Sequence, residues 1–123
     1  MSGTTILIAE DIDSNYIVLE RFLLLTGARV LRARNGLEAI ETVRSETSVD
    51  LVLMDMQMPV VNGYEATREI LRIRPGLPVI AQTAYSIDFD EKTAMEAGCI
   101  AYTVKPLVMK DLLNLVGKIL GSR

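Results

Sequence analysis

The chain has 123 residues, of which 50% are hydrophobic and 24% charged, a length and composition typical of one globular domain over residues 1–123. With a single cysteine, Cys99, and no histidine, it cannot form an internal disulfide, an ordinary zinc site, or a Ser/His/Asp or Cys/His catalytic centre. The net charge of −3 and the scattered basic residues argue against nucleic-acid binding. Because the N-terminus lacks a basic signal segment and no apolar run approaches the roughly 20 residues of a membrane span, we expect no membrane insertion and a cytoplasmic location.

Five short apolar runs, rich in β-branched residues, predict five strands. They are Thr5 to Ala9, Ala28 to Leu31, Leu51 to Met54, Val79 to Ala81 and Ala101 to Val104. Each interval between them holds one crossover helix, which parallel pairing requires. The nearly continuous apolar character of the runs favours a sheet that is covered on both faces.

Helical patterns fill the intervals between the predicted strands. Apolar stripes run from Ile17 to Leu25 and from Ala39 to Val43, and further helices are predicted at Gly63 to Ile73, Asp88 to Ala97 and Met109 to Leu120. Right-handed crossovers then favour an α/β, flavodoxin-like (βα)5 fold, a three-layer sandwich around a parallel five-stranded sheet in the order 2-1-3-4-5.

Polar residues follow four of the predicted strands. Glu10 and Asp11 follow the first strand, Asp55 the third, Thr83 the fourth and Lys105 the fifth. In a doubly wound sheet the carboxyl ends of the strands meet at one edge, where ligands bind. We therefore expect these side chains to converge on one site.

Adjacent carboxylates repel one another unless a cation compensates their charge. Oxygen ligands without nitrogen or sulfur donors favour Mg²⁺, with Mn²⁺ as a possible substitute, and such a site is completed by waters and a phosphate oxygen. Asp55 is then the predicted nucleophile, because Asp can form an acyl phosphate, and Thr83 and Lys105 would bind the phosphoryl oxygens. Gln57 could present its backbone carbonyl to the metal, beside Glu10 and Asp11.

Four stretches of the sequence resemble the receiver domain of two-component response regulators. They are ILIAED at 6–11, LMDMQMP at 53–59, QTAY at 82–85 and YTVKP at 102–106, and together they span essentially the whole chain. The resemblance implies that Asp55 is phosphorylated by a phosphohistidine of a histidine kinase or a histidine phosphotransfer protein. It also implies that Glu10, Asp11, Asp55 and the Gln57 carbonyl hold Mg²⁺.

The resemblance also implies how the domain would signal. Thr83 and Lys105 would respond to the phosphoryl group, Pro106 would follow a cis peptide bond, and Tyr102 would change rotamer together with Thr83. The output surface would lie on the fourth helix, fifth strand and fifth helix, with contributions from Tyr85, Ile87, Tyr102 and Val108. Such a domain modifies and dephosphorylates itself but turns over no external substrate. We expect a monomer or weak dimer, either a stand-alone regulator or part of a hybrid kinase, with a downstream protein partner that the sequence does not identify.

Two alternatives stay open. A phosphatase resembling the haloacid dehalogenase class would use Asp11 as nucleophile and Asp13 as acid/base, although Asn15 stands where that class has Thr or Val. A flavodoxin-like nucleotide- or flavin-binding module lacks a phosphate-binding loop after the first strand, where Glu10 and Asp11 would repel phosphate.

Overall fold

The computed structural model describes residues 3–84, 91–105 and 108–121, the side chains of Ala84, Glu91 and Lys105 excepted. The strands are β1 (Thr5–Ala9), β2 (Arg29–Ala33), β3 (Val49–Asp55), β4 (Val79–Ala84) and β5 (Ala101–Lys105). The helices are α1 (Asp13–Leu25), α2 (Gly36–Ser45), α3 (Gly63–Ile73), α4 (Glu91–Ala97) and α5 (Met109–Gly121). None of the helices in these ranges is long and apolar enough to cross a bilayer.

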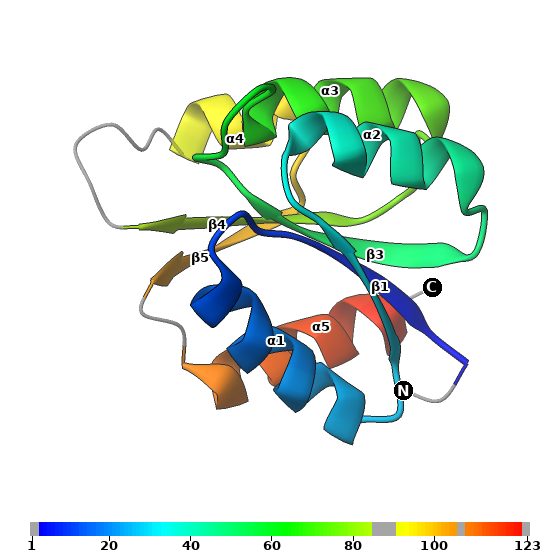
Figure 1. Ribbon diagram of the computed structural model, residues 1–123, viewed down its shortest axis with the longest axis vertical. Helices are drawn as coiled ribbons and strands as arrows, with labels where there is room; N and C mark the ends of the chain where they lie inside the picture. The colour runs from blue at the N-terminus through cyan, green and yellow to red at the C-terminus, as the bar shows by residue number, and fades with distance from the viewer. Residues whose placement is uncertain (1–2, 85–90, 106–107, 122–123) are drawn as a thin grey trace.

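The strands form one parallel sheet in the order β2-β1-β3-β4-β5, which confirms the predicted topology. Helices α1 and α5 cover one face of this sheet, and α2, α3 and α4 cover the other (Figure 1). Side chains along a strand alternate between the two faces of the sheet, and each face is covered by helices. The central strands must therefore be apolar on both faces.

The core accordingly has two parts, one on each face of the sheet. One cluster joins Leu7, Val52 and Ala81 to α2, α3 and α4, and the other joins Ile8 and Leu53 to α1 and α5. All five of these strand residues are at most 1% exposed. Full burial of each larger aliphatic side chain contributes about 2 kcal/mol, so the two clusters hold the strand ends in fixed register.

Several strand boundaries differ from the sequence prediction, and β2, β3, β4 and β5 all end later than predicted. Strand β2 begins at Arg29, one residue later than predicted, and β3 begins at Val49 rather than Leu51. Asp50 interrupts the apolar pattern of β3, but its Oδ2 accepts a hydrogen bond of 2.8 Å from the backbone amide of Thr5. This hydrogen bond to β1 satisfies the polar side chain of Asp50 within β3, a position at which the apolar pattern of the sequence predicts no strand.

The stripe predicted for the first helix is only partly buried. Tyr16, Leu19 and Leu23 face the sheet, at helical spacing, whereas the other apolar residues of this helix are exposed. The exposed group comprises Ile17, Val18, Phe22, Leu24 and Leu25. Helix α1 therefore presents an apolar outer surface.

The predicted turn signals are confirmed where they are described. The side chains of Asn35 and Asn62 accept hydrogen bonds from the amides of Glu38 and Glu65 and cap α2 and α3. Helix α4 ends before Gly98, which has a φ of +114°. The predicted start of this helix at Asp88 lies outside the described residues.

Candidate functional site

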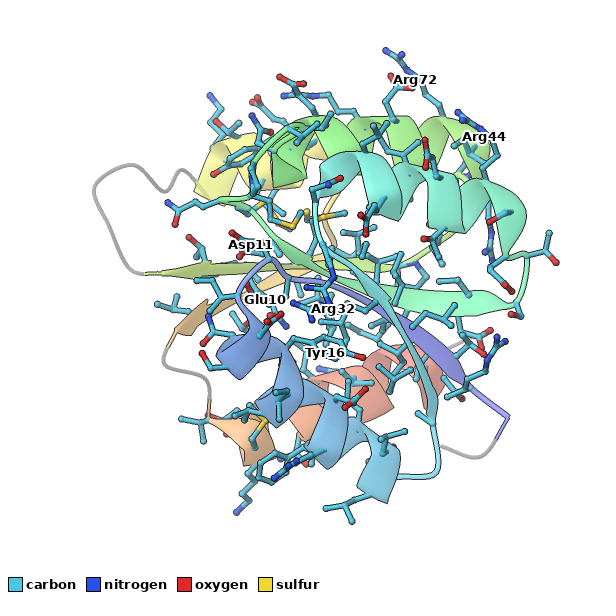
Figure 2. All side chains as sticks on the ribbon, in the orientation of Figure 1. Glu10, Asp11, Tyr16, Arg32, Arg44 and Arg72 are labelled. Atoms are coloured by element: carbon cyan, nitrogen blue, oxygen red, sulfur yellow. The ribbon has the colours of Figure 1, made fainter. Side chains whose placement is uncertain are left out.

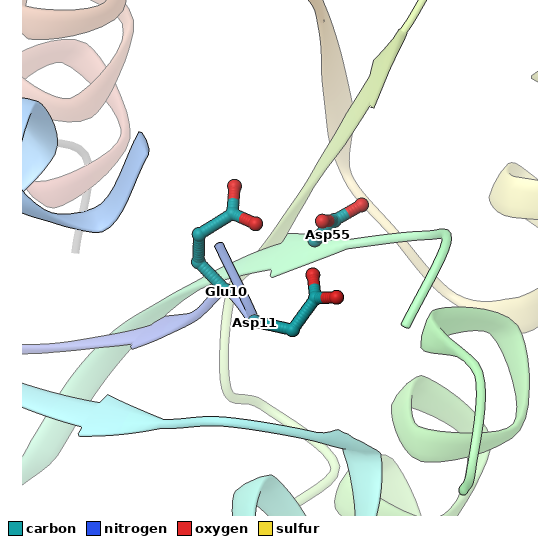
Figure 3. A group of neighbouring side chains, drawn as sticks. All are labelled: Glu10, Asp11 and Asp55. Carbon is teal, nitrogen blue, oxygen red and sulfur yellow. The ribbon is translucent and has the colours of Figure 1, made fainter. Parts of the chain in front are cut away.

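The register of the sheet brings the predicted carboxylates together. Ala9 pairs with Met54, so that Glu10, the residue after β1, and Asp55, the last residue of β3, lie side by side. The ligand atoms of Glu10, Asp11 and Asp55 all lie within 4.8 Å of one another (Figure 3). The predicted convergence of these three carboxylates is confirmed.

Burial makes this cluster costly unless its charge is compensated. Glu10 is fully buried and accepts a hydrogen bond of 3.3 Å from the Ile12 amide through Oε2, and Asp55 is only 4% exposed. Within the described residues, the buried Oδ1 atom of Asp11 has no hydrogen-bond partner. Three gathered carboxylates, one with an unpartnered buried oxygen, fit a hard divalent cation, which takes oxygen ligands.

Gln57 contributes to the site through a contact that the sequence did not reveal. Its backbone amide donates a hydrogen bond of 2.9 Å to Asp55 Oδ1, while its side chain is exposed. This is the turn in which an Asp side chain accepts from the amide two residues on, so the pair Asp55 and Gln57 was the available signal. The hydrogen bond fixes the orientation of the Asp55 carboxylate.

The remaining predicted site residues lie on β4 and β5. Thr83 is fully buried and pairs with Val104, and Lys105 pairs with Ala84 at the end of β5. Tyr102 is 39% exposed, on β5. Four predictions, the Lys105 side chain, the cis bond before Pro106, and the roles of Tyr85 and Ile87, fall outside the described residues.

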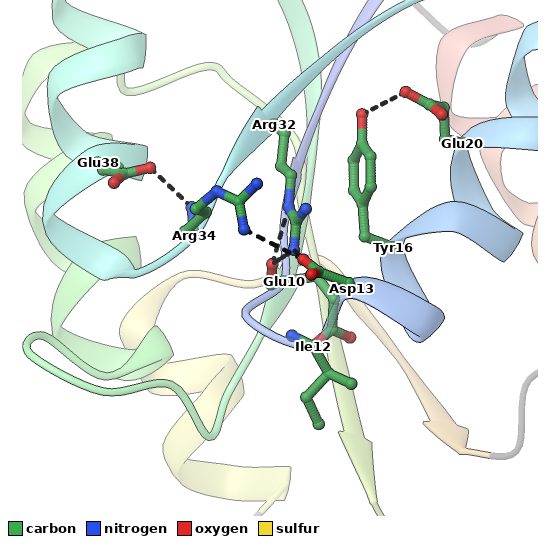
Figure 4. Close-up of polar contacts among 8 residues, drawn as sticks. All are labelled: Glu10, Ile12, Asp13, Tyr16, Glu20, Arg32, Arg34 and Glu38. Carbon is green, nitrogen blue, oxygen red and sulfur yellow. Dashed lines mark hydrogen bonds and ion pairs between the residues drawn. The ribbon is translucent and has the colours of Figure 1, made fainter.

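Asp13 lies beside the cluster but is not part of it. Its Oδ1 atom is 2.8 Å from Arg32 Nη2 and 3.1 Å from Arg34 Nη1 (Figure 4). The hydrogen bond from Arg32, followed by that from Arg34 and by both positive charges, lowers the pKa of the Asp13 carboxyl below its usual value. A carboxylate held ionised by two guanidinium groups is poorly suited to the acid/base role that the phosphatase alternative assigns to Asp13.

Arg32 is a residue at the site that sequence reasoning missed. Its guanidinium donates hydrogen bonds to the backbone carbonyl of Glu10 and lies over the ring of Tyr16 on α1. Figure 2 shows Arg32 and Tyr16 near the carboxylates, whereas Arg44 and Arg72 lie on α2 and α3, away from the site. An arginine near the carboxyl end of β2, the strand next to β1, was the signal that could have found it.

Comparison with known proteins gives one consistent result. The family model described as the response regulator receiver domain matches residues 6–117. The polar-differentiation response regulator DivK of Brucella anthropi is 35% identical over 121 residues, covering 96% of this chain and 97% of its own.

Solved structures agree with the family match. The receiver domain of the sensor histidine kinase PA1611 from Pseudomonas aeruginosa PAO1, solved with a magnesium ion coordinated in the active site cleft, is 33% identical. The match covers 98% of this chain and 99% of that one, with a TM-score of 0.89. The receiver domain of Ssk1 from Saccharomyces cerevisiae, in complex with the histidine phosphotransfer protein Ypd1, is 28% identical, covers 94% and 87% and has a TM-score of 0.85.

These relatives support neither the phosphatase nor the nucleotide- or flavin-binding alternative. The parallel 2-1-3-4-5 sheet, the acidic cluster at its edge and the family match over residues 6–117 point the same way. The chain therefore belongs to the response regulator receiver domain family, the phosphoacceptor domains of two-component signalling.

Proposed function

We propose that Asp55 accepts a phosphoryl group from a phosphohistidine in a Mg²⁺-dependent reaction. The observation that carries this proposal is the cluster of the buried Glu10 and Asp55 with the partly buried Asp11, whose Oδ1 atom is unpartnered within the described residues. These carboxylates, with the backbone carbonyl of Gln57, would hold the metal, and the same oxygen ligands suit Mn²⁺. Bound metal would offset the negative charge of the incoming phosphoryl group.

Among the three carboxylates, Asp55 is suited to be the nucleophile. It ends the central strand β3, and the Gln57 amide holds its Oδ1 atom at 2.9 Å. A carboxylate oxygen attacks phosphorus, the P–N bond breaks, and the histidine nitrogen leaves with the electron pair and takes up a proton. Attack by water on the acyl phosphate releases phosphate and restores Asp55, so the domain catalyses its own modification and no external turnover.

The response to phosphorylation would pass from Thr83 and Lys105 to Tyr102. Phosphorylation adds a charge of about −1.5 to −2 and three acceptor oxygens, which the Thr83 hydroxyl and the Lys105 ammonium group would bind. Thr83 is buried on β4, and Tyr102 is half-exposed on the adjacent β5. A shift of Thr83 toward the phosphoryl group would let the Tyr102 ring turn inward and change the surface of α4, β5 and α5, including Val108.

The phosphoryl donor would be a histidine kinase or a histidine phosphotransfer protein. Helix α1 begins two residues after Asp11, and its exposed apolar residues Ile17, Val18 and Phe22 lie on its outer surface. Such a surface beside a reaction site is typical of protein docking. The yeast receiver noted above was crystallised with a histidine phosphotransfer protein. We propose residues 1–123 as one receiver domain that works as a monomer or weak dimer.

The proposal is tested by intact-mass measurement after incubation with acetyl phosphate or phosphoramidate, with and without Mg²⁺. We expect one phosphoryl adduct that requires Mg²⁺, is absent from Asp55→Asn, and maps to the peptide that contains Asp55. Asp111→Asn, which changes an exposed carboxylate in the first turn of α5, is the matched control and should still be modified.

Two results would contradict the assignment. An adduct that persists in Asp55→Asn and maps to Asp11 would favour phosphatase-like chemistry. No adduct from either donor in the wild-type chain, at saturating Mg²⁺, would show that the cluster does not catalyse phosphoryl transfer to Asp55.

A further inference from the structure

The backbone of Glu10 is held by strand β2 in two different ways. The β1 and β2 ladder ends with the pair Ala9 and Ala33, and the Glu10 amide then donates a hydrogen bond of 3.0 Å to the Ala33 carbonyl. The Glu10 carbonyl accepts from a side chain instead, since Arg32 Nη2 and Nε lie 3.1 and 3.3 Å from it (Figure 4). The guanidinium thus extends the sheet bonding beyond the last strand residue.

The same guanidinium also reaches helix α1. Its Nη2 atom lies 2.8 Å from Asp13 Oδ1, and its carbon lies 4.3 Å from the centre of the Tyr16 ring. The Tyr16 hydroxyl in turn donates a hydrogen bond of 2.7 Å to Glu20 Oε2. Arg32 is only 15% exposed, so water competes little for these contacts.

Between its two anchor points, Arg32 spans the segment that carries two of the three clustered carboxylates. It contacts the carbonyl of Glu10 at one end and the side chain of Asp13 at the other, and Asp11 lies between them. We propose that Arg32 is a positioning residue for the metal site: it fixes the turn at residues 10–13 and so keeps the carboxylates of Glu10 and Asp11 gathered with Asp55. This inference rests on the proposed function, because it assumes that the cluster binds a divalent cation.

Positioning and simple electrostatics predict opposite effects when Arg32 is removed. A positive charge near a cation site repels the cation, so its loss alone would tighten Mg²⁺ binding. Loss of a group that orients a ligand residue weakens metal binding, typically by 10- to 100-fold. The direction of the change therefore distinguishes the two roles.

Arg34 provides a matched control. It also binds Asp13, at 3.1 Å, but it is 60% exposed and none of its hydrogen bonds in the described residues reaches the Glu10 carbonyl. Arg34→Met removes the same charge from the same carboxylate without releasing the backbone of Glu10. Arg32→Met keeps most of the aliphatic stem over Tyr16 and removes the guanidinium.

The first measurement is the Kd of Mg²⁺ by titration calorimetry on the full chain. We expect Arg32→Met to raise the Kd about 10-fold, Arg34→Met to leave it unchanged or slightly lower, and Arg32→Lys to restore part of the affinity through one donor. Melting in EDTA confirms that each variant is folded. A Kd for Arg32→Met that is equal to or lower than that of Arg34→Met would overturn the proposal.

The second measurement needs no metal. The Ile12 amide donates to the Glu10 carboxylate, so its hydrogen exchange in EDTA reports the order of the turn. We expect faster exchange at Ile12 in Arg32→Met and wild-type exchange in Arg34→Met; equal protection in both variants would refute the positioning role.

The two measurements separate the inference from the proposed function. If the wild-type chain failed to bind Mg²⁺, the proposed function would fail, and the role of Arg32 at a metal site would fail with it. The Ile12 exchange would then show only whether Arg32 anchors the turn at residues 10–13. If Arg32→Met did not fold, Arg32→Lys would decide: it carries the same charge, so a several-fold weaker Kd supports positioning and a wild-type Kd contradicts it.

Discussion

Gly63 lets helix α3 begin directly against the backbone that carries Asp55. A Cβ atom at this position would lie 2.4 Å from the Asp55 carbonyl oxygen and 2.7 Å from the Met56 Cα. The Gly63 amide also donates a hydrogen bond of 3.3 Å to the Met56 carbonyl, which joins the start of the helix to the end of β3. The position requires glycine for space, since both close atoms belong to the backbone and a side-chain rotation cannot relieve the overlap.

Gly63→Ala should therefore lower the free energy of unfolding by about 1 to 3 kcal/mol, as expected for an overpacked site. Because the backbone that must move carries Asp55, the variant should also be phosphorylated more slowly. Gly117→Ala is the control: a Cβ there meets nothing within 4 Å, and alanine in a helix interior should raise stability by up to about 1 kcal/mol. Urea denaturation checks both, and equal effects of the two substitutions would contradict the packing argument.

Tyr16 predicts a second residue-scale effect, at alkaline pH. Burial, then the hydrogen bond and charge of Glu20, raise the pKa of its phenol to about 12 from the usual value of 10. Because the folded-state pKa is higher than the unfolded one, the neutral phenol stabilises the fold fully below pH 10, and this contribution is lost as the pH rises toward 12.

The absorbance of tyrosinate at 295 nm tests this directly. The wild-type chain, which has four tyrosines, should show one titration step near pH 12 that Tyr16→Phe removes. The variant's stability should also fall less steeply than the wild type's between pH 10 and 12. A titration curve that is unchanged by the substitution, apart from the lost amplitude at pH 10, would show that the Tyr16 phenol is not shielded.

At the scale of the element, helix α1 shows which packing contacts stabilise the fold. Leu23 is fully buried against the sheet, whereas Leu25, two residues later, is 83% exposed. Leu23→Ala should lower the free energy of unfolding by about 2 to 5 kcal/mol, through lost burial and a new cavity, and Leu25→Ala should change it by less than about 0.5 kcal/mol. Chemical denaturation measures the free energy of unfolding of both variants. Similar decreases for the two would contradict the burial difference, because they would mean that Leu25 is also packed against other residues in solution.

The same helix shows what periodicity can and cannot predict. Strands β1 and β3 were predictable because they are buried on both faces, so their apolar runs mark them directly. In α1 nearly every position from Ile17 to Leu25 is apolar, and therefore the pattern predicts a helix without showing which side faces the sheet.

The site divides in a similar way. Strand ends and topology are enough to predict that Glu10, Asp11 and Asp55 meet, because parallel strands end at a common edge. The contact of Arg32 with the Glu10 carbonyl joins residues 22 positions apart through a side-chain rotamer, which no local pattern encodes. The Gln57 amide is intermediate, since the turn that it closes is local but its use at the site depends on β3.

At the scale of the whole molecule, the acidic cluster couples metal binding to folding. The two hydrophobic clusters hold β1 and β3 together, which places ligand atoms of the three carboxylates within 4.8 Å of one another. In the metal-free protein their mutual repulsion opposes folding, and in the metal-bound protein the same charges bind the cation. A substitution that removes one of these carboxylates should therefore stabilise the metal-free protein but reduce the stabilisation that Mg²⁺ gives.

Asp11→Asn tests this coupling. In EDTA the substitution removes one repelling charge and gives the partly buried position a hydrogen-bond donor for its neighbours, so the variant should be more stable than the wild type by about 1 kcal/mol. In Mg²⁺ at 100 times the wild-type Kd, binding should stabilise the wild type by about 2.7 kcal/mol. The variant, with a lost ligand, should gain much less, so that the order of the two melting temperatures reverses.

Asp111→Asn makes the same charge change on an exposed helix position and should respond to Mg²⁺ as the wild type does. Melting curves in EDTA and in Mg²⁺ at matched ionic strength give the answer: if the wild type were the more stable protein in both conditions, the carboxylates would not repel one another enough to require a cation.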